Sequence, residues 1–183
     1  SSSTVVMVVG ADDALKETFG AELVARFGGS ALSVQELVAA ACSEEGDAAD
    51  ALLATLKAGK LVSAETSLRL LLAARASTPP PHYVLDFPRL ASQLPLLEGS
   101  AGAVACALEL AAEGEGADRM TEARLKPLRA AGRAHPIAAG GGGEASLKAA
   151  VGAAIAVLRG VGFVPSTALA ERTVGHRRRA EAA

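Results

Sequence analysis

A glycine and a lysine near the start of the chain have the spacing of a phosphate-binding loop. Gly10 follows the continuous apolar, β-branched run 4–9, and Lys16 lies six residues later, followed by Glu17 and Thr18. This order of strand, glycine, short loop, lysine and helix is that of the motif G-x-x-x-x-G-K-[ST], whose backbone N–H groups and lysine hold nucleotide phosphates. Gly10, Lys16 and Thr18 are therefore the candidate nucleotide-binding residues of this loop.

The same loop departs from the motif in ways that oppose phosphate binding. Leu15 stands where the second glycine is expected, and Glu17 stands in place of the small hydroxyl residue. Asp12 and Asp13 add two further carboxylates. Two unit charges 4 Å apart interact by about 4 kcal/mol at an effective dielectric of 20, and a micromolar complex is worth only roughly 8 kcal/mol. The alternative, which we favour, is that Asp12 or Asp13 caps the following helix.

The elements that must position this loop alternate between strands and helices. The apolar runs predict strands over residues 4–9, 31–32, 83–85, 103–108 and 134–138. Helical periodicity and capping signals predict helices over 12–27, from 33 onward, 46–58, 65–75, 117–131 and 144–159, with Pro127 expected to kink or shorten its helix. This pattern predicts an α/β fold, a three-layer α/β/α doubly wound parallel sheet. Ligands bind such sheets at the carboxyl ends of the strands, so the loops of interest are 10–17, 33–39 and 86–93.

The composition excludes several classes of partner and site. The net charge is −2 and aromatic residues make up 3% of the chain, which gives no case for binding DNA or RNA. No apolar run is long enough to cross a membrane. Cys42 and Cys106 have no metal or redox spacing and are expected to be reduced core thiols. His82 and His135 have no ligand set near them in the sequence, so no metal site is predicted.

The sequence divides into a main domain and a basic tail. Residues 1–160 contain all the predicted strands and suit one compact domain, and residues 161–183 follow it with a cluster of one histidine and three arginines at 176–179. We expect the tail to be a solvated terminal helix, with an acidic protein surface as a second possibility. The chain has no initiator methionine and begins almost on its first strand, so we expect it to be a piece of a longer polypeptide or a processed or trimmed chain.

Three further segments match motifs of a known family, in order with the first loop. Residues 32–37 are similar to L-S-T-G-D-L, residues 59–65 to G-x-L-V-P-x-E, and residues 85–93 to L-D-G-[FY]-P-R…Q. Together with the loop at 10–18, these segments resemble the adenylate kinase (nucleoside monophosphate kinase) family. The resemblance covers about residues 4–98, and more loosely extends to 160. It implies a fold of the P-loop nucleoside monophosphate kinase type.

The resemblance also implies roles for individual residues. Lys16 would contact the transferred phosphates, Asp86 would help to hold Mg²⁺ through water, and Arg89 would grip the phosphate of the acceptor nucleotide. Gln93 would recognise the acceptor base. Lys16, Asp86 and Arg89 are thus the candidate vestigial catalytic residues. Each has a structural alternative: Asp86 can cap the next helix, and Arg89 can pair with an acid.

The chain departs from the family on the acceptor side and at the lid. Ala39 stands where an arginine would hold the monophosphate, and the glycine between Asp86 and Phe87 is deleted. The family carries a mobile lid that supplies arginines, whereas residues 108–134 have room for about one helix. We therefore expect a reduced lid. Four arginines lie on this segment: Arg119, Arg124, Arg129 and Arg133. Either Arg124 or Arg133 could replace a lid arginine. We favour the alternative that the four arginines form a solvated basic face.

These departures lead to one main hypothesis and two alternatives. The chain is predicted to be a catalytically impaired adenylate kinase-like domain, a pseudokinase without cofactor, that serves as a structural or interaction module in a larger protein or assembly. Its partners would be other protein chains. The reduced cysteines suit a cytoplasmic location, and the resemblance adds the ciliary axoneme, where degenerate domains of this kind occur. The alternatives are a divergent active kinase that uses ATP and Mg²⁺, and a nucleotide sensor without turnover.

Overall fold

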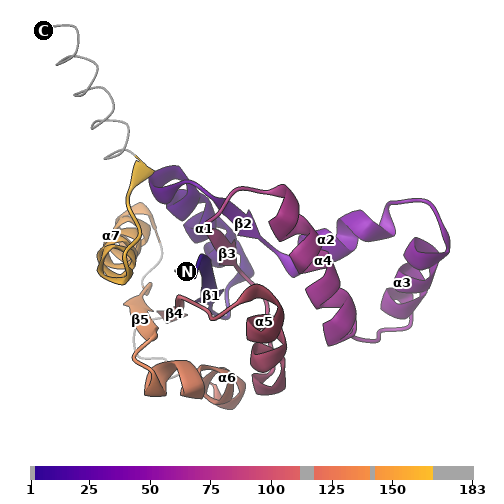
Figure 1. The fold of residues 1–183 in the computed structure, drawn as a ribbon. Coiled ribbons are helices and arrows are strands. Elements are labelled where there is room, and N and C mark those ends of the chain that lie inside the picture. Colours follow the sequence, from indigo (N-terminus) through magenta and orange to yellow (C-terminus); the bar gives the residue numbers. More distant parts are fainter. Residues whose placement is uncertain (1–2, 112–117, 141–142, 167–183) are drawn as a thin grey trace, which may run out of the picture.

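Five parallel strands form one sheet at the centre of the protein. A computed structural model describes residues 3–111, 118–140 and 143–166 (Figure 1). The strand order is β2-β3-β1-β4-β5, and every pairing is parallel. The strands are β1 (Val5–Val9), β2 (Ser30–Leu32), β3 (His82–Val84), β4 (Cys106–Ala111) and β5 (Ala134–Ala138). The predicted α/β class and the parallel sheet are confirmed, and the last strand lies at one edge of the sheet.

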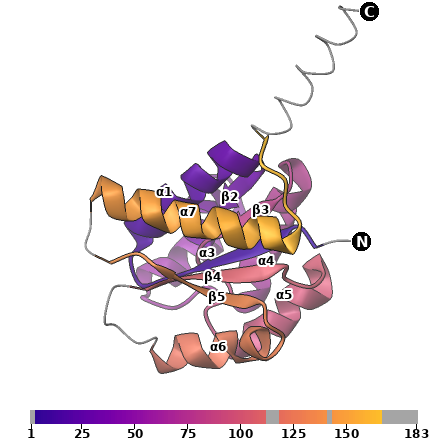
Figure 2. The ribbon, with the colours of Figure 1, turned by 90° about the vertical axis from the view of Figure 1, so that its left-hand side faces the viewer.

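Helices cover both faces of this sheet. On one face lie α1 (Asp13–Phe27) and α7 (Glu144–Val161); on the other lie α2 (Val34–Cys42), α4 (Ala64–Ser77), α5 (Leu94–Ala101) and α6 (Arg119–Ala130). Figure 2 shows α1 and α7 above the strands and α6 below them. The helix α3 (Asp47–Lys57) packs against α2 and stands away from the sheet (Figure 1).

The central strand explains how a continuous apolar run specifies this architecture. All five residues of β1 are buried. Val6 and Val8 pack with α1 and α7, whereas Val5, Met7 and Val9 pack with the helices of the opposite face. Successive side chains of a strand point to opposite faces, so a strand that is covered on both sides needs an apolar residue at every position. The burial of β1 on both faces, predicted from the sequence, is confirmed.

Most of the predicted elements lie within a few residues of the observed ones, and three differ. The fourth strand was predicted at 103–108 and lies at Cys106–Ala111, so it contains Glu109. A charged residue is tolerated there because the buried Glu109 carboxylate pairs with Arg129 at 2.7 Å. A short 3-10 helix, η1 (Ala91–Gln93), and α5 were not predicted.

The helix α6 runs from Arg119 to Ala130 through Pro127, close to the helix predicted at 117–131. Proline removes one backbone donor and crowds the preceding turn. Leu125 and Leu128, which flank it, are fully buried against the sheet, and their packing holds this turn in place. Both cysteines are free thiols: Cys106 is buried, which raises its pKa to about 12, whereas Cys42 is only half-buried.

The tail lies mostly outside the described residues, including the basic cluster at 176–179. The structure describes the chain up to Ser166, whose hydroxyl donates to the carbonyl of Arg26 at the end of α1 at 2.8 Å. Among the described residues, no helix is long and apolar enough to cross a membrane.

The Glu109–Arg129 pair predicts a measurable loss of stability on mutation. Arg129→Met leaves the buried Glu109 carboxylate without its charged donor, so we expect the free energy of unfolding to fall by about 2 kcal/mol. Glu122→Gln removes the other carboxylate that pairs with Arg129. Because the Glu122 side chain is half-exposed, we expect the free energy of unfolding to fall by less than about 1 kcal/mol. Urea unfolding of the two variants measures the difference; equal losses would contradict the role given to Glu109.

His82 predicts a fall in stability at mildly acidic pH. Its ring is buried at the start of β3, with Nε2 at 3.1 Å from Thr78 Oγ1 and Nδ1 without a partner among the described residues. Burial lowers the pKa of His82 below its usual 6.5, a hydrogen bond with the Thr78 carbonyl partly opposes this, and the charge of Arg75 lowers it further. The unfolded chain therefore binds more protons, and stability is lost as the pH falls from about 6.5 towards the folded pKa.

The measurement is urea unfolding at pH 7.5, 6.5 and 5.5. We expect the free energy of unfolding to fall less over this range in His82→Gln than in the unmodified protein. His135→Gln is the matched control and should retain the full fall. A His82→Gln variant with an unchanged pH dependence would show that another group is responsible.

Candidate functional site

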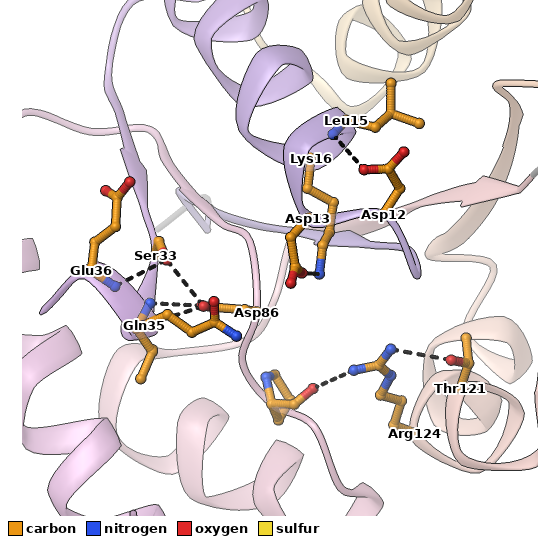
Figure 3. A network of polar contacts seen from close by, with 12 residues as sticks. Asp12, Asp13, Leu15, Lys16, Ser33, Gln35, Glu36, Asp86, Thr121 and Arg124 are labelled. Atoms are coloured by element: carbon orange, nitrogen blue, oxygen red, sulfur yellow. Dashed lines mark hydrogen bonds and ion pairs between the residues drawn. The ribbon is translucent and has the colours of Figure 1, made fainter. Parts of the chain in front are cut away.

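A pocket of about 270 Å³ opens at the carboxyl ends of the strands. It lies where an open α/β sheet is expected to bind a ligand. Three elements supply most of its lining: the loop after β1, the loop after β3, and the start of α6 (Figure 3). The lining residues are Gly10, Ala11, Asp13, Lys16, Gln35, Asp86, Arg89, Asp118, Met120, Thr121 and Arg124.

The first turn of α1 satisfies its own polar groups. The carboxylate of Asp12 accepts a hydrogen bond from the backbone N–H of Leu15 at 3.0 Å, as expected for a helix cap. The carboxylate of Asp13 lies 3.0 Å from Nζ of Lys16. The lysine side chain is only 9% exposed, so its charge has little access to water and gains most from a partner within the protein.

Two of the unusual residues in this loop have structural explanations. A Cβ at position 10 would lie 3.2 Å from both the Cβ and the carbonyl oxygen of Leu110, so the close approach of β4 favours glycine there. Leu15 packs against the apolar cluster beneath α1 and α7 and does not line the pocket. Thr18 does not line it either, because its hydroxyl donates to the carbonyl of Ala14 in the same helix at 3.0 Å.

Asp86 is a buried cap of α2. One carboxylate oxygen accepts from the N–H of Val34 at 2.6 Å, and the other accepts from the Ser33 hydroxyl and the N–H of Gln35, both at 3.0 Å. The hypothesis that Asp86 caps the next helix is wrong. Because β2 and β3 are neighbours, the end of β3 lies beside the start of the earlier helix α2. Ser33 also caps α2, as predicted, by accepting from the N–H of Glu36 at 3.3 Å.

This arrangement does not suit Asp86 as a ligand-side group for Mg²⁺. Both of its carboxylate oxygens are already committed to the first turn of α2, and the side chain is buried. Within residues 3–111, 118–140 and 143–166, no three His, Cys, Asp or Glu side chains are grouped to hold a metal ion. The described part of the chain therefore offers no preformed carboxylate set for a magnesium–nucleotide complex.

Arg89 lies at the pocket, whereas Gln93 does not. The Gln93 side-chain oxygen accepts from the backbone N–H groups of Arg89 at 2.8 Å and Leu90 at 3.1 Å. It thus closes the loop in front of η1 and is not free to recognise a base. The Arg89 side chain is exposed and lines the pocket, and it forms no ion pair with the other described residues.

Arg124 was one of two candidates for a lid arginine, and it lines the pocket. Its guanidinium donates to the carbonyl of Pro88 at 3.0 Å and to the Thr121 hydroxyl at 3.1 Å (Figure 3). Burial, and to a smaller extent the charge of Arg89, lower the pKa of Arg124 from its usual value; the charges of Asp118 and Glu109 act in the opposite direction. The guanidinium is thus anchored rather than mobile.

The favoured interpretation of the α6 arginines as a solvated face is wrong for three of the four. Arg124 is half-buried at the pocket, and Arg129 bridges Glu109 and Glu122. Arg133 donates to the carbonyl of Val104 at 2.5 Å and does not reach the pocket. Arg119 alone is exposed. Helical spacing placed Arg119, Arg124 and Arg129 on one helix, and Arg133 lies just beyond its end at Ala130. The sequence could not show that the partners of the last three would be Glu109, Glu122, Thr121 and the backbone of neighbouring loops.

The structure thus brings together four of the six predicted site residues and adds others. Gly10, Lys16, Asp86 and Arg89 line one pocket, whereas Thr18 and Gln93 do not. The additional lining residues that the sequence did not single out include Gln35, Asp118 and Met120. Asp118 caps α6 by accepting from the N–H of Thr121 at 2.7 Å, and this bond lowers its pKa. The only signal for it was its position before a helical pattern.

Comparisons with known proteins do not identify a family for this chain. No family model matches the chain, and no curated protein matches it. The resemblance to adenylate kinases therefore depends on the motifs themselves.

The role of Asp86 as a cap predicts a large effect of its removal on stability. Asp86→Ala deprives three donors of their acceptor, two of them on the backbone of α2, and we expect the free energy of unfolding to fall by about 3 kcal/mol. Asp12→Ala removes an exposed cap that accepts one hydrogen bond and should cost about 1 kcal/mol. Urea unfolding measures both. A loss for Asp86→Ala no greater than that for Asp12→Ala would mean that Asp86 has little structural role.

Proposed function

We propose that this chain is a catalytically impaired adenylate kinase-like domain that acts as a structural or interaction module in a larger protein or assembly. One observation carries the proposal: the polar groups that would perform phosphoryl transfer are bonded within the chain. The ammonium of Lys16 pairs with Asp13, and the carboxylate of Asp86 caps α2. The amide oxygen of Gln93 caps η1.

The donor side of the pocket opposes a polyphosphate electrostatically. Asp13 lies within contact distance of the lysine that would receive the phosphate, and Asp12 already occupies the N–H of Leu15. A phosphate would have to displace the carboxylate of Asp13 from Lys16. It would also have to approach a turn in which the N–H of Leu15 is already bonded to Asp12. Phosphoryl transfer depends almost entirely on positioning and on stabilisation of charge, so these carboxylates act against both requirements.

The acceptor side and the lid give the same indication. Ala39, at the position of the expected arginine, supplies no charge on α2. The strand β4 ends at Ala111 and α6 begins at Arg119, so only residues 112–118 connect them. A segment of this length has no room for a separate closing domain. Without closure, water would compete with the acceptor for the transferred phosphoryl group.

Exposed apolar side chains support a role in protein–protein contact. On α3 and the loop after it, Leu53, Leu56 and Leu61 are exposed, and Leu61 is 90% exposed. Leu90 and Met120 are exposed near the pocket. Exposed apolar side chains favour a binding partner where they form one contiguous patch. The proposal therefore includes other protein chains as partners, in the cytoplasm and, following the family resemblance, in the ciliary axoneme.

A second candidate function is favoured by the pocket itself. Lys16, Arg89 and Arg124 come from three separate elements and line one pocket of about 270 Å³. Three converging cations suit a phosphorylated ligand. A divergent kinase or a nucleotide sensor would need this convergence, whereas a purely structural domain would not.

A phosphoryl-transfer assay distinguishes these functions. With ATP, Mg²⁺ and a panel of nucleoside monophosphates, we expect no turnover above that of Lys16→Ala. Lys60→Ala, which removes an exposed lysine away from the pocket, is the matched control. Turnover that is lost in Lys16→Ala but kept in Lys60→Ala would contradict the proposal and identify an active kinase.

Calorimetric titration with ATP and Mg²⁺ complements the assay. The proposal predicts no saturable heat at micromolar nucleotide. Micromolar binding that is lost in Lys16→Ala and is unaccompanied by turnover would identify a nucleotide sensor.

A further inference from the structure

We infer that Asp13 acts as a built-in anion, which occupies the ammonium of Lys16 in place of a phosphate and keeps polyphosphates out of the pocket. This inference deepens the proposed function and rests on it. The two side chains come from the first turn of α1, both line the pocket, and their charged atoms are 3.0 Å apart (Figure 3).

The environment of Lys16 distinguishes this contact from an ordinary ion pair on a helix surface. Pairs three residues apart on exposed helices contribute little, because water competes for both charges. Here the lysine side chain is 9% exposed and the aspartate 61%. The buried cation thus depends on its partner, whereas the aspartate is free to turn into solvent. Asp13 should therefore prevent anions of low charge from binding to Lys16, whereas a more highly charged anion could displace it.

The other carboxylates near the pocket are committed elsewhere. Asp12 accepts from Leu15, Asp86 from the first turn of α2, and Asp118 from Thr121. Among the described residues, Asp13 is the carboxylate that forms an ion pair with a cation of the pocket. Neutralising Asp13 alone should therefore change the charge that a ligand meets, without removing a helix cap.

The far side of the pocket supports an anionic ligand once Asp13 is neutral. Arg124 lies across the pocket from Lys16, and its Nε is buried without a hydrogen-bond partner among the described residues (Figure 3). Arg89 also lines the pocket, and its positive charge contributes to lowering the pKa of Arg124. In Asp13→Asn, three cations would face the remaining acids, Asp86 and Asp118, so the charge of the lining would change from balanced to positive.

The test is a calorimetric titration with inorganic tripolyphosphate at about 0.15 M ionic strength, where exposed charges more than about 8 Å apart are screened. We expect Asp13→Asn to bind at least tenfold more tightly than the unmodified protein, which corresponds to about 1.4 kcal/mol. Glu17→Gln is the matched control, because it removes one negative charge from the same helix but forms no ion pair with Lys16 among the described residues. It should change the affinity by less than about twofold, as expected for an exposed, screened charge.

The double variant Asp13→Asn/Lys16→Ala completes the design and should lose the gain. Equal affinities of Asp13→Asn and Glu17→Gln, or a gain that persists in the double variant, would overturn the inference. Circular dichroism of each variant shows that it is folded, which is expected because Asp13 is exposed and caps no helix. The titration uses no nucleotide, and the turnover assay uses no Asp13 variant. Failure of this inference is therefore distinguishable from failure of the proposed function.

Discussion

The N–H groups at helix starts are the constraint on which this edge of the protein depends. Helices that follow parallel strands begin at the carboxyl edge of the sheet, and each begins with backbone donors that have no partner within the helix. Here acidic side chains accept from α1, α2 and α6 at the edge where the pocket lies: Asp12, Asp86 and Asp118. A protein that binds phosphate can leave such donors to its ligand, whereas in this chain an acidic side chain accepts from at least one of them in each of these helices.

Self-capping has a direct electrostatic consequence for the pocket. Lys16, Arg89 and Arg124 would give the lining a positive field, but Asp13, Asp86 and Asp118 line it as well. The charges balance, and Asp13 and Lys16 form an ion pair. The lining therefore carries three cations and three carboxylates, with no net charge when all six are ionised. Fold and chemistry can separate in this way because packing of the sheet does not require the ligand.

The fold was largely predictable because local signals and tertiary packing agree. The apolar run of β1, the glycine stop after α1 and the Ser33 cap of α2 each specify an element through interactions between neighbouring residues. Prediction failed where distant contacts decide the outcome. Glu109 lies inside β4, beyond the predicted end of that strand, because Arg129 neutralises it.

By itself, the sequence determined the α/β class, the parallel sheet and the placement of the loops at its carboxyl edge, because hydrophobic period and capping residues are local properties. Only the tertiary structure decided what each site residue does. It joined Asp86 to the start of α2 and Arg124 to the pocket, and it left Thr18 and Gln93 outside. The physical reason is that a carboxylate or guanidinium binds whichever partner the fold brings within 3 Å or so, and that partner is far away in the sequence.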